Sequence, residues 1–268
     1  KADSYHFAFA VACISLVLSI IIYYAFRKTF AHADRAKIAT KGASEVAEEE
    51  LTPAQTKERI ICLCLVFAVV IFFWMAFHQN GLTLTYFADE FTSRSSEGVE
   101  ALAFNVWNLV CVIVMVYAGF SLFQGKTAQT KVISAIVFAA ALGIIIWQYM
   151  SQEGAVKVSA PIFQQFNPFY VVALTPISLA IFGALAKRGK EPSAPRKIAY
   201  GMIIAALGFV VMAVGSIGLP EPQTEIVNGE KVAMHVADVT PQLLIYTYLV
   251  LTFAELLLSP MGISFVSK

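Results

Sequence analysis

Long apolar runs alternate with short polar segments along the whole chain. Seven of these runs are continuously apolar, whereas the strands of a membrane barrel would alternate between apolar and polar residues. Each run is long enough to cross a bilayer, because a spanning helix needs roughly 20 mostly apolar residues. We therefore predict an all-α, polytopic membrane helix bundle with seven transmembrane helices. Their approximate ranges are 6–26, 60–79, 101–123, 132–150, 168–186, 198–217 and 242–265.

The composition agrees with a membrane protein. Of the 268 residues, 58% are hydrophobic and 14% are charged, which is more apolar side chain than one soluble core of that size needs. Cys13, Cys62, Cys64 and Cys111 all lie within apolar runs, where a thiol behaves as a small hydrophobic group. Cys62 and Cys64 lack the CxxC spacing and no His cluster accompanies them. We expect no disulfide, no metal site and no cofactor beyond a proton gradient.

The basic residues are distributed unevenly between the two ends of the predicted helices. Fifteen of the nineteen Lys and Arg residues lie in the segments 27–59, 124–131 and 187–197 or at the C-terminus, which would share one side. Basic residues accumulate on the cytoplasmic side of membrane proteins. We therefore predict a multi-pass protein of the cytoplasmic membrane, with its first residues outside and its last residues inside. The net charge of +1 gives no indication of a nucleic-acid partner.

Two polar segments separate groups of spans. Residues 27–58 carry charges of both signs, which indicates a solvated cytoplasmic linker, with a surface helix suggested around EVAEEEL. Residues 218–241 contain IVNGEKVAMHV, and its Asn-Gly pair predicts a short external hairpin that acts as a cap. The first apolar run follows KADSYH, which lacks the basic region of a signal peptide. We expect the chain to be part of a larger transporter-like protein.

Three glycines share one face of the span at 198–217. Gly201, Gly208 and Gly215 are each seven residues apart. Small residues along one stripe allow neighbouring helices to approach closely. We predict a packing role for these glycines and no chemistry.

Glu255 is the one carboxylate in the middle of a predicted span. Together with Tyr248, Thr252, Ser259 and Gly262 it forms a stripe with spacings of four, three, four and three. An ionisable residue at that depth is costly and usually functional. Glu255 therefore either pairs with a Lys or Tyr of another helix or meets a cationic ligand or a proton, and the second reading is favoured because no other span offers a cationic partner.

A second polar stripe contains Trp74, His78, Gly81 and Thr85, again spaced four, three and four. The unperturbed pKa of histidine lies near physiological pH, so an imidazole that faces a cavity can exchange protons. A membrane histidine can equally form a structural hydrogen bond to another helix. Both interpretations of His78 stay open at this point.

The segment QQFNP, residues 164–168, forms a third polar cluster at the start of a span. Asn167 before Pro168 is typical of a helix cap followed by a first-turn proline. Gln164 and Asn167 can alternatively present their amides to a central cavity. The cluster alone does not decide between these roles.

Three stretches together resemble a known family. FFWMAFHQNG with LTLTYFAD, FQQFNPFYVVALTPI with GKEPSAPRKIAYG, and ELLLSPMGISFVSK are similar to the seventh, the eighth to ninth, and the tenth helices of the proton-dependent oligopeptide transporter (POT) family of the major facilitator superfamily. SYHFAFAVACISLVL resembles the sixth helix. The resemblance implies that 1–26 is the last helix of the N-terminal bundle, 27–58 the linker and 59–268 an incomplete C-terminal bundle. Residues 101–150 would be a helix pair inserted after the seventh helix.

The resemblance also implies roles for individual residues. Glu255 matches a glutamate that holds the amino terminus of a peptide, and Asn167 matches an asparagine that contacts the peptide backbone. Trp74 and Gln79 fall in the seventh-helix motif that lines the cavity. We add Tyr248 and Ser259 to the predicted substrate site, because they lie on the stripe of Glu255. His78 stands where the family usually has an acid, and it is, with Glu255, a candidate for proton coupling.

The function that the resemblance implies is proton-coupled symport of di- and tripeptides by alternating access between two bundles. The expected partners are peptides, protons and the lipid bilayer. One alternative is a transporter of the same fold for another small amine- or amino-acid-like substrate, and a second is a non-transporting membrane scaffold. No catalytic constellation is present, so we do not expect an enzyme.

Overall fold

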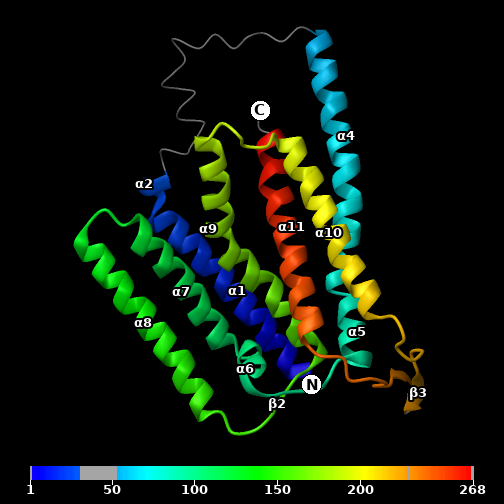
Figure 1. Cartoon of the computed structure of the whole chain (residues 1–268). Helices are drawn as coiled ribbons and strands as arrows, with labels where there is room; N and C mark the ends of the chain where they lie inside the picture. Colours follow the sequence, from blue (N-terminus) through cyan, green and yellow to red (C-terminus); the bar gives the residue numbers. More distant parts are fainter. Residues whose placement is uncertain (1, 31–52, 228–229, 267–268) are drawn as a thin grey trace. The chain divides into compact units, whose positions relative to one another are not determined.

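The computed structural model describes residues 2–30, 53–227 and 230–266 (Figure 1). The chain divides into two compact units, Lys1–Glu58 and Arg59–Lys268. The first unit contains α1 (Ala2–Ala25) and the short α2 (Arg27–Phe30). The predicted surface helix around EVAEEEL lies outside the described residues.

Helices make up most of the second unit. α4 begins at Pro53, before the boundary at Arg59, and continues into this unit. The helices are α4 (Pro53–Phe77), α5 (Thr83–Phe91), α6 (Gly98–Ala101), α7 (Val106–Gln124), α8 (Ala128–Ser151), α9 (Phe166–Lys187), α10 (Ala194–Gly215) and α11 (Gln242–Val266). Three short 3₁₀ segments are η2 (His78–Asn80), η3 (Leu102–Phe104) and η4 (Ala160–Gln165). The strands are β1 (Ser95–Ser96), β2 (Val156–Lys157), β3 (Thr224–Val227) and β4 (Glu230–Ala233).

Every predicted span coincides with a long helix, which confirms the all-α membrane bundle. Within the residues that the structure describes, five helical segments are long and apolar enough to cross a membrane, and Phe9–Ala25 and Gln242–Leu258 are shorter apolar segments. The five segments are Ile60–Phe91, Val106–Gln124, Ala128–Ser151, Ala160–Lys187 and Ala194–Gly215. Many large apolar side chains on these helices are exposed, as expected of surfaces that face lipid.

The closest helix pair in the second unit is α10 with α11, and the glycine face of α10 forms the contact. A Cβ atom on Gly201 would lie 2.9 Å from the Ala254 carbonyl oxygen, and one on Gly208 would lie 3.2 Å from a Val250 methyl carbon. Gly215 faces Leu243 in the same way. The predicted packing role of these glycines is confirmed, and it brings α11 into the middle of the buried core.

Helices α7 and α8 form an antiparallel hairpin with a hydrogen bond near each end. At one end the Asn105 side chain donates to Gln148 Oε1 across 2.9 Å, and at the other Ser134 Oγ donates to Ser121 Oγ across 2.7 Å. The Tyr117 hydroxyl donates to the Val172 carbonyl of α9 across 3.3 Å. The pair is therefore joined to the rest of the unit through α9.

The segment between α10 and α11 contains the predicted hairpin. β3 and β4 pair antiparallel, with Thr224 opposite Ala233 and Val227 opposite Glu230, so the hairpin prediction is confirmed. Its turn residues, Asn228 and Gly229, lie outside the described residues. The following segment is bonded to the end of α5, since the Val239 amide donates to the Phe91 carbonyl and the Ser93 amide donates to the Val239 carbonyl.

Three of the element boundaries that differ from the prediction have local reasons. α4 ends at Phe77, and the polar residues that follow form a 3₁₀ turn. The span predicted from residue 101 begins at Val106, because Asn105 caps α7 by accepting a hydrogen bond from the Trp107 amide at 2.9 Å. α10 begins four residues early, at Ala194, with Pro195 in its first turn, where proline is favoured.

Candidate substrate site

The site centres on a hydrogen-bonded group that joins α9 and α11. Asn167 Nδ2 donates to Glu255 Oε2 across 3.0 Å and to Thr252 Oγ1 across 3.2 Å. Thr252 has no exposed surface, whereas Asn167 and Glu255 are half-buried. The structure therefore brings together two predicted site residues that are 88 positions apart in the chain.

Asn167 is not a helix cap, so that interpretation was wrong. α9 begins at Phe166, directly after η4, and the proline at the start of the combined helical segment is Pro161. Asn167 thus lies within the first turn of a helix that is already under way. Because no backbone donor requires its side chain, the amide is available for α11.

Glu255 has no cationic partner among the residues that the structure describes. The ion pairs there are Arg94 with Asp89, Lys197 with Glu191 and His235 with Asp238. The predicted alternative of a structural Lys or Tyr partner for Glu255 is not observed in this part of the chain. Within it, Glu255 Oε1 and Asn167 Oδ1 are two hydrogen-bond acceptors without a partner.

The polar residues after Phe77 break the helix and expose backbone carbonyls. His78, Gln79 and Asn80 form η2, and α5 starts again at Thr83. A break of this kind leaves carbonyl groups without their usual helical partners. The Tyr248 hydroxyl of α11 donates to one of them, the Asn80 carbonyl, across 2.7 Å. Tyr248 is 1% exposed, so its hydroxyl is committed to this contact in the observed conformation.

A second side chain meets the same break from η4. Gln164 Nε2 donates to the Gly81 carbonyl at 3.4 Å and to Thr85 Oγ1 at 3.2 Å. Thr85 in turn donates to the Gly81 carbonyl across 3.1 Å. The stripe predicted to contain Gly81 and Thr85 therefore faces the η4 segment that leads into Asn167.

The remaining predicted residues lie at the end of α4 and in η2. The Thr83 hydroxyl donates to Gln79 Oε1 across 2.6 Å, and the Trp74 and His78 rings lie 5.8 Å apart at an interplanar angle of 32°. His78 is exposed. Its imidazole contacts the rings of Trp74 and Phe77, and it has no hydrogen bond or ion pair with another described residue. The structure does not bring His78 to Glu255. The side chain of Ser259 lies outside the described residues.

Two features of the site gave no direct signal in the sequence. The Asn80 contact uses a backbone carbonyl, which every residue possesses, so only the run of polar residues after an apolar helix pointed to it. Phe73 and Phe77 form a buried stacked pair with ring centroids 5.6 Å apart, and they back Trp74. Their spacing of four on one helix face is the signal that could have identified this wall.

Comparison with known proteins places these residues in a family. The family model described as the POT family matches residues 126–268, which is just over half of the chain. The chain belongs to the POT family. The match contains Asn167, Tyr248 and Glu255, and the POT family is part of the major facilitator superfamily.

The curated relatives differ in how much of the chain they match. The chain is 25% identical over 280 residues to the uncharacterized transporter YclF of Bacillus subtilis, which covers 99% of this chain and 49% of that protein. It is 32% identical over 109 residues to dipeptide and tripeptide permease B of Salmonella typhimurium and 29% identical over 105 residues to the permease of the same name from Edwardsiella piscicida. Each permease match covers 39% of this chain and 19% of the permease. The chain thus spans about half the length, or less, of the relatives it matches, and no solved structure matches it.

Proposed function

We propose that the protein to which this chain belongs is a proton-coupled symporter of di- and tripeptides in the cytoplasmic membrane. The observation that carries the proposal is the Asn167 to Glu255 hydrogen bond, which places a carboxylate without a cationic partner in the described part of the chain beside a polar amide. Membership of the POT family and the likeness to dipeptide and tripeptide permeases support a peptide as cargo.

The two unpartnered oxygens would bind the amino terminus of a peptide. An ammonium group donates up to three hydrogen bonds and accepts none. Glu255 Oε1 and Asn167 Oδ1 supply two acceptors, one of them charged, from neighbouring helices. A charge pair formed in a partly buried, low-dielectric site is much stronger than in water, so the ammonium would be the main anchor of the substrate.

Glu255 is one of two candidates for coupling the substrate to protons. It can hold a proton or pair with an ammonium, but not both at once, whereas a symporter carries its proton and its peptide together. A proton on Glu255 would therefore have to pass to a second group when the peptide binds. His78 is the second candidate for the proton path, because an imidazole can bind and release a proton, and this exposed side chain has no hydrogen bond or ion pair to another described residue that a change of charge would break.

Trp74, Gln79 and Ser259 would line the cavity around the peptide, with Gln79 and Asn167 orienting its backbone by hydrogen bonds. Tyr248 would join them only after a conformational change, since its hydroxyl is buried against the Asn80 carbonyl. Its release from Asn80 would coincide with movement of α11 against the break after α4. Such a movement would take place within the C-terminal bundle, 59–268, and would accompany alternating access between this bundle and the N-terminal bundle, which contains α1 and is joined to it by the linker 27–58.

Uptake by the full-length protein in proteoliposomes tests the proposal. We expect a labelled dipeptide to accumulate against its gradient when the outside is acidic, and we expect accumulation to collapse in Glu255→Gln. Glu153→Gln, which changes an exposed carboxylate between α8 and β2, is the matched control. Absence of peptide uptake by the folded wild type would instead favour a transporter of another small amine. The observation that supports this alternative is that His78 stands where the family usually has an acidic residue. Unchanged uptake in Glu255→Gln would contradict the role of this carboxylate.

A further inference from the structure

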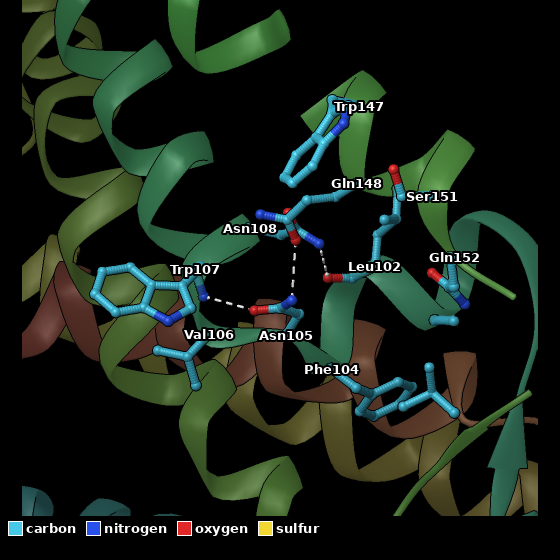
Figure 2. Close-up of a pocket in the computed structure, with 12 residues that line it drawn as sticks. Leu102, Phe104, Asn105, Val106, Trp107, Asn108, Trp147, Gln148, Ser151 and Gln152 are labelled. Carbon is cyan, nitrogen blue, oxygen red and sulfur yellow. Dashed lines mark hydrogen bonds between the residues drawn. The ribbon is translucent and has the colours of Figure 1, made fainter. Parts of the chain in front are cut away.

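The outer end of the α7 and α8 hairpin contains a cavity of about 650 Å³ that lies outside the substrate site (Figure 2). The first turn of α7, the segment before it and the last turn of α8 line it. Sites for small molecules commonly have volumes of about 300–1,000 Å³ and combine apolar walls with a few polar groups. This cavity has both properties, since Leu102 and Phe104 form part of an apolar wall and four side-chain amides provide polar groups, namely Asn105, Asn108, Gln148 and Gln152.

Hydrogen bonds hold three of these amides in place, and they leave one amide donor and one amide acceptor without a partner among the described residues. The Asn105 side chain accepts a hydrogen bond from the Trp107 amide and donates one to Gln148 Oε1, each across 2.9 Å. Figure 2 shows the hydrogen bond between the Asn105 and Gln148 side chains as a dashed line. Asn108 donates to the Leu102 carbonyl across 3.1 Å. Among the described residues, Gln148 Nε2 has no acceptor, and Asn108 Oδ1 has no donor.

The unpartnered Asn108 oxygen is the strongest indication of a missing ligand. Asn108 is 3% exposed, and its Oδ1 atom is buried without a hydrogen bond. A buried acceptor that is left unpaired costs about 1–3 kcal/mol, so most such groups in folded proteins have a partner. This oxygen is closed to water in the observed conformation, so a ligand hydroxyl would supply the donor once the Asn108 side chain turns toward the cavity.

The chemistry of the lining identifies the class of ligand. No charged residue lines the cavity in the part of the chain that the structure describes, which disfavours phosphate and ammonium groups. An ammonium only donates hydrogen bonds and a phosphate oxygen only accepts them, whereas a hydroxyl does both and so matches the mixture of free amide donors and acceptors. Trp107 and Trp147, 72% and 67% exposed, add flat apolar faces at the mouth, which suit the C–H face of a sugar ring.

We propose that this cavity binds an uncharged, polyhydroxylated ring, that is, a sugar, at the outer surface of the membrane. The positive-inside distribution of charge puts this end of the hairpin outside, and exposed tryptophans are typical of the membrane interface. Such a ring is carried either by a soluble saccharide or by the headgroup of a glycolipid. The ligand chemistry is the same in both cases.

Two probes and three variants of the full-length protein test the proposal. In nanodiscs, native mass spectrometry compares retention of a diglucosyl diacylglycerol with phosphatidylcholine of the same acyl chains, and tryptophan fluorescence follows titration with free maltose. Asn108→Ala and Gln148→Leu should each weaken binding about three- to tenfold, the range for one lost hydrogen bond between neutral groups. Gln124→Leu, at the other end of α7, is the matched control and should bind as the wild type does.

The results distinguish a glycolipid headgroup from a soluble saccharide, and they can show that the cavity binds neither. Selective retention of the glycolipid without maltose binding assigns a lipid headgroup, and maltose binding assigns a soluble saccharide, provided that the variants lower it. Gln148 is only half-buried, so Gln148→Leu keeps the test valid if Asn108→Ala does not fold. Binding of neither probe by the wild type, or equal binding by wild type and Gln148→Leu, overturns the proposal.

Discussion

The Tyr248 hydroxyl donates a 2.7 Å hydrogen bond to the Asn80 backbone carbonyl, and this bond ties the middle of the second unit to the break after α4. The two residues are 168 positions apart. Asn80 directly follows Gln79, and Tyr248 lies about two turns before Glu255 on α11. The contact thus joins the conformation of α11, which carries Glu255, to that of the segment that carries Gln79.

Tyr248→Phe should destabilise the protein by about 1 kcal/mol, because it removes the hydrogen bond that the buried Tyr248 hydroxyl donates to the Asn80 carbonyl. Thermal unfolding of the detergent-solubilised full-length protein, with a melting temperature lowered by a few degrees, checks the expectation. Tyr246→Phe is the matched control, since Tyr246 is 58% exposed two residues away on the same helix and should not change the melting temperature. Equal effects of the two changes would show that the hydrogen bond does not contribute.

Gly201→Ala should destabilise the protein by about 1–3 kcal/mol, the usual cost of overpacking. Its new Cβ would lie 2.9 Å from the Ala254 backbone oxygen, which can move only if α10 and α11 separate. Gly215→Ala should cost less, because its nearest neighbours are the flexible end of the Leu243 side chain. Gly143→Ala in α8 meets open space and should be neutral or stabilising, so melting temperatures ranked in any other order contradict the packing account.

Glu191→Ala should destabilise the loop between α9 and α10 by about 1–3 kcal/mol. Lys197 is 3% exposed. Its Nζ atom lies 2.5 Å from Glu191 Oε1 and 4.3 Å from the centre of the Phe182 ring. Loss of Glu191 would therefore leave a buried charge whose remaining contact is the Phe182 ring. The effect is smaller than for a fully buried pair, because the Glu191 side chain is 43% exposed. Limited proteolysis of the loop measures the change. Lys190→Ala alters an exposed charge nearby and should leave the cleavage rate as it is.

His78→Ala separates the two roles left open for this residue. If His78 carries protons, the variant should keep peptide exchange between equal concentrations on both sides and lose accumulation driven by a pH gradient. Reduced exchange with an unchanged pH dependence would instead make His78 a binding residue. Tyr86→Ala, an exposed aromatic change on α5, is the control for general loss of transport.

The sequence predicted the parts of this fold that depend on periodicity. Apolar length located every long helix, and the spacing of Gly201, Gly208 and Gly215 identified the contact face of α10. Spacing also put Thr252 and Glu255 on one face of α11, and the structure adds that Asn167 bonds to both. These features follow from local geometry, which a single helix already determines.

The parts that the sequence did not predict depend on partners distant in the chain. Asn167 before Pro168 matched a local cap, but the helix had already begun at Phe166, so the tertiary contact with Glu255 determined its role. The role of the Asn80 carbonyl likewise depends on a distant side chain, that of Tyr248 on α11. The cavity beside the Asn105 to Gln148 bond also depends on side chains from both α7 and α8, so neither helix alone indicates it.

The central claim, that Glu255 holds the amino terminus of a peptide, is tested most directly by a double comparison of binding. Affinities of dialanine and N-acetyl-dialanine are measured for the full-length wild type and for Glu255→Gln. We predict that the wild type binds dialanine at least about tenfold more tightly than N-acetyl-dialanine. Glu255→Gln should lose most of this preference, because neither peptide can then form an ion pair with residue 255. The same preference in wild type and variant would contradict the claim, since the ammonium would then be recognised elsewhere.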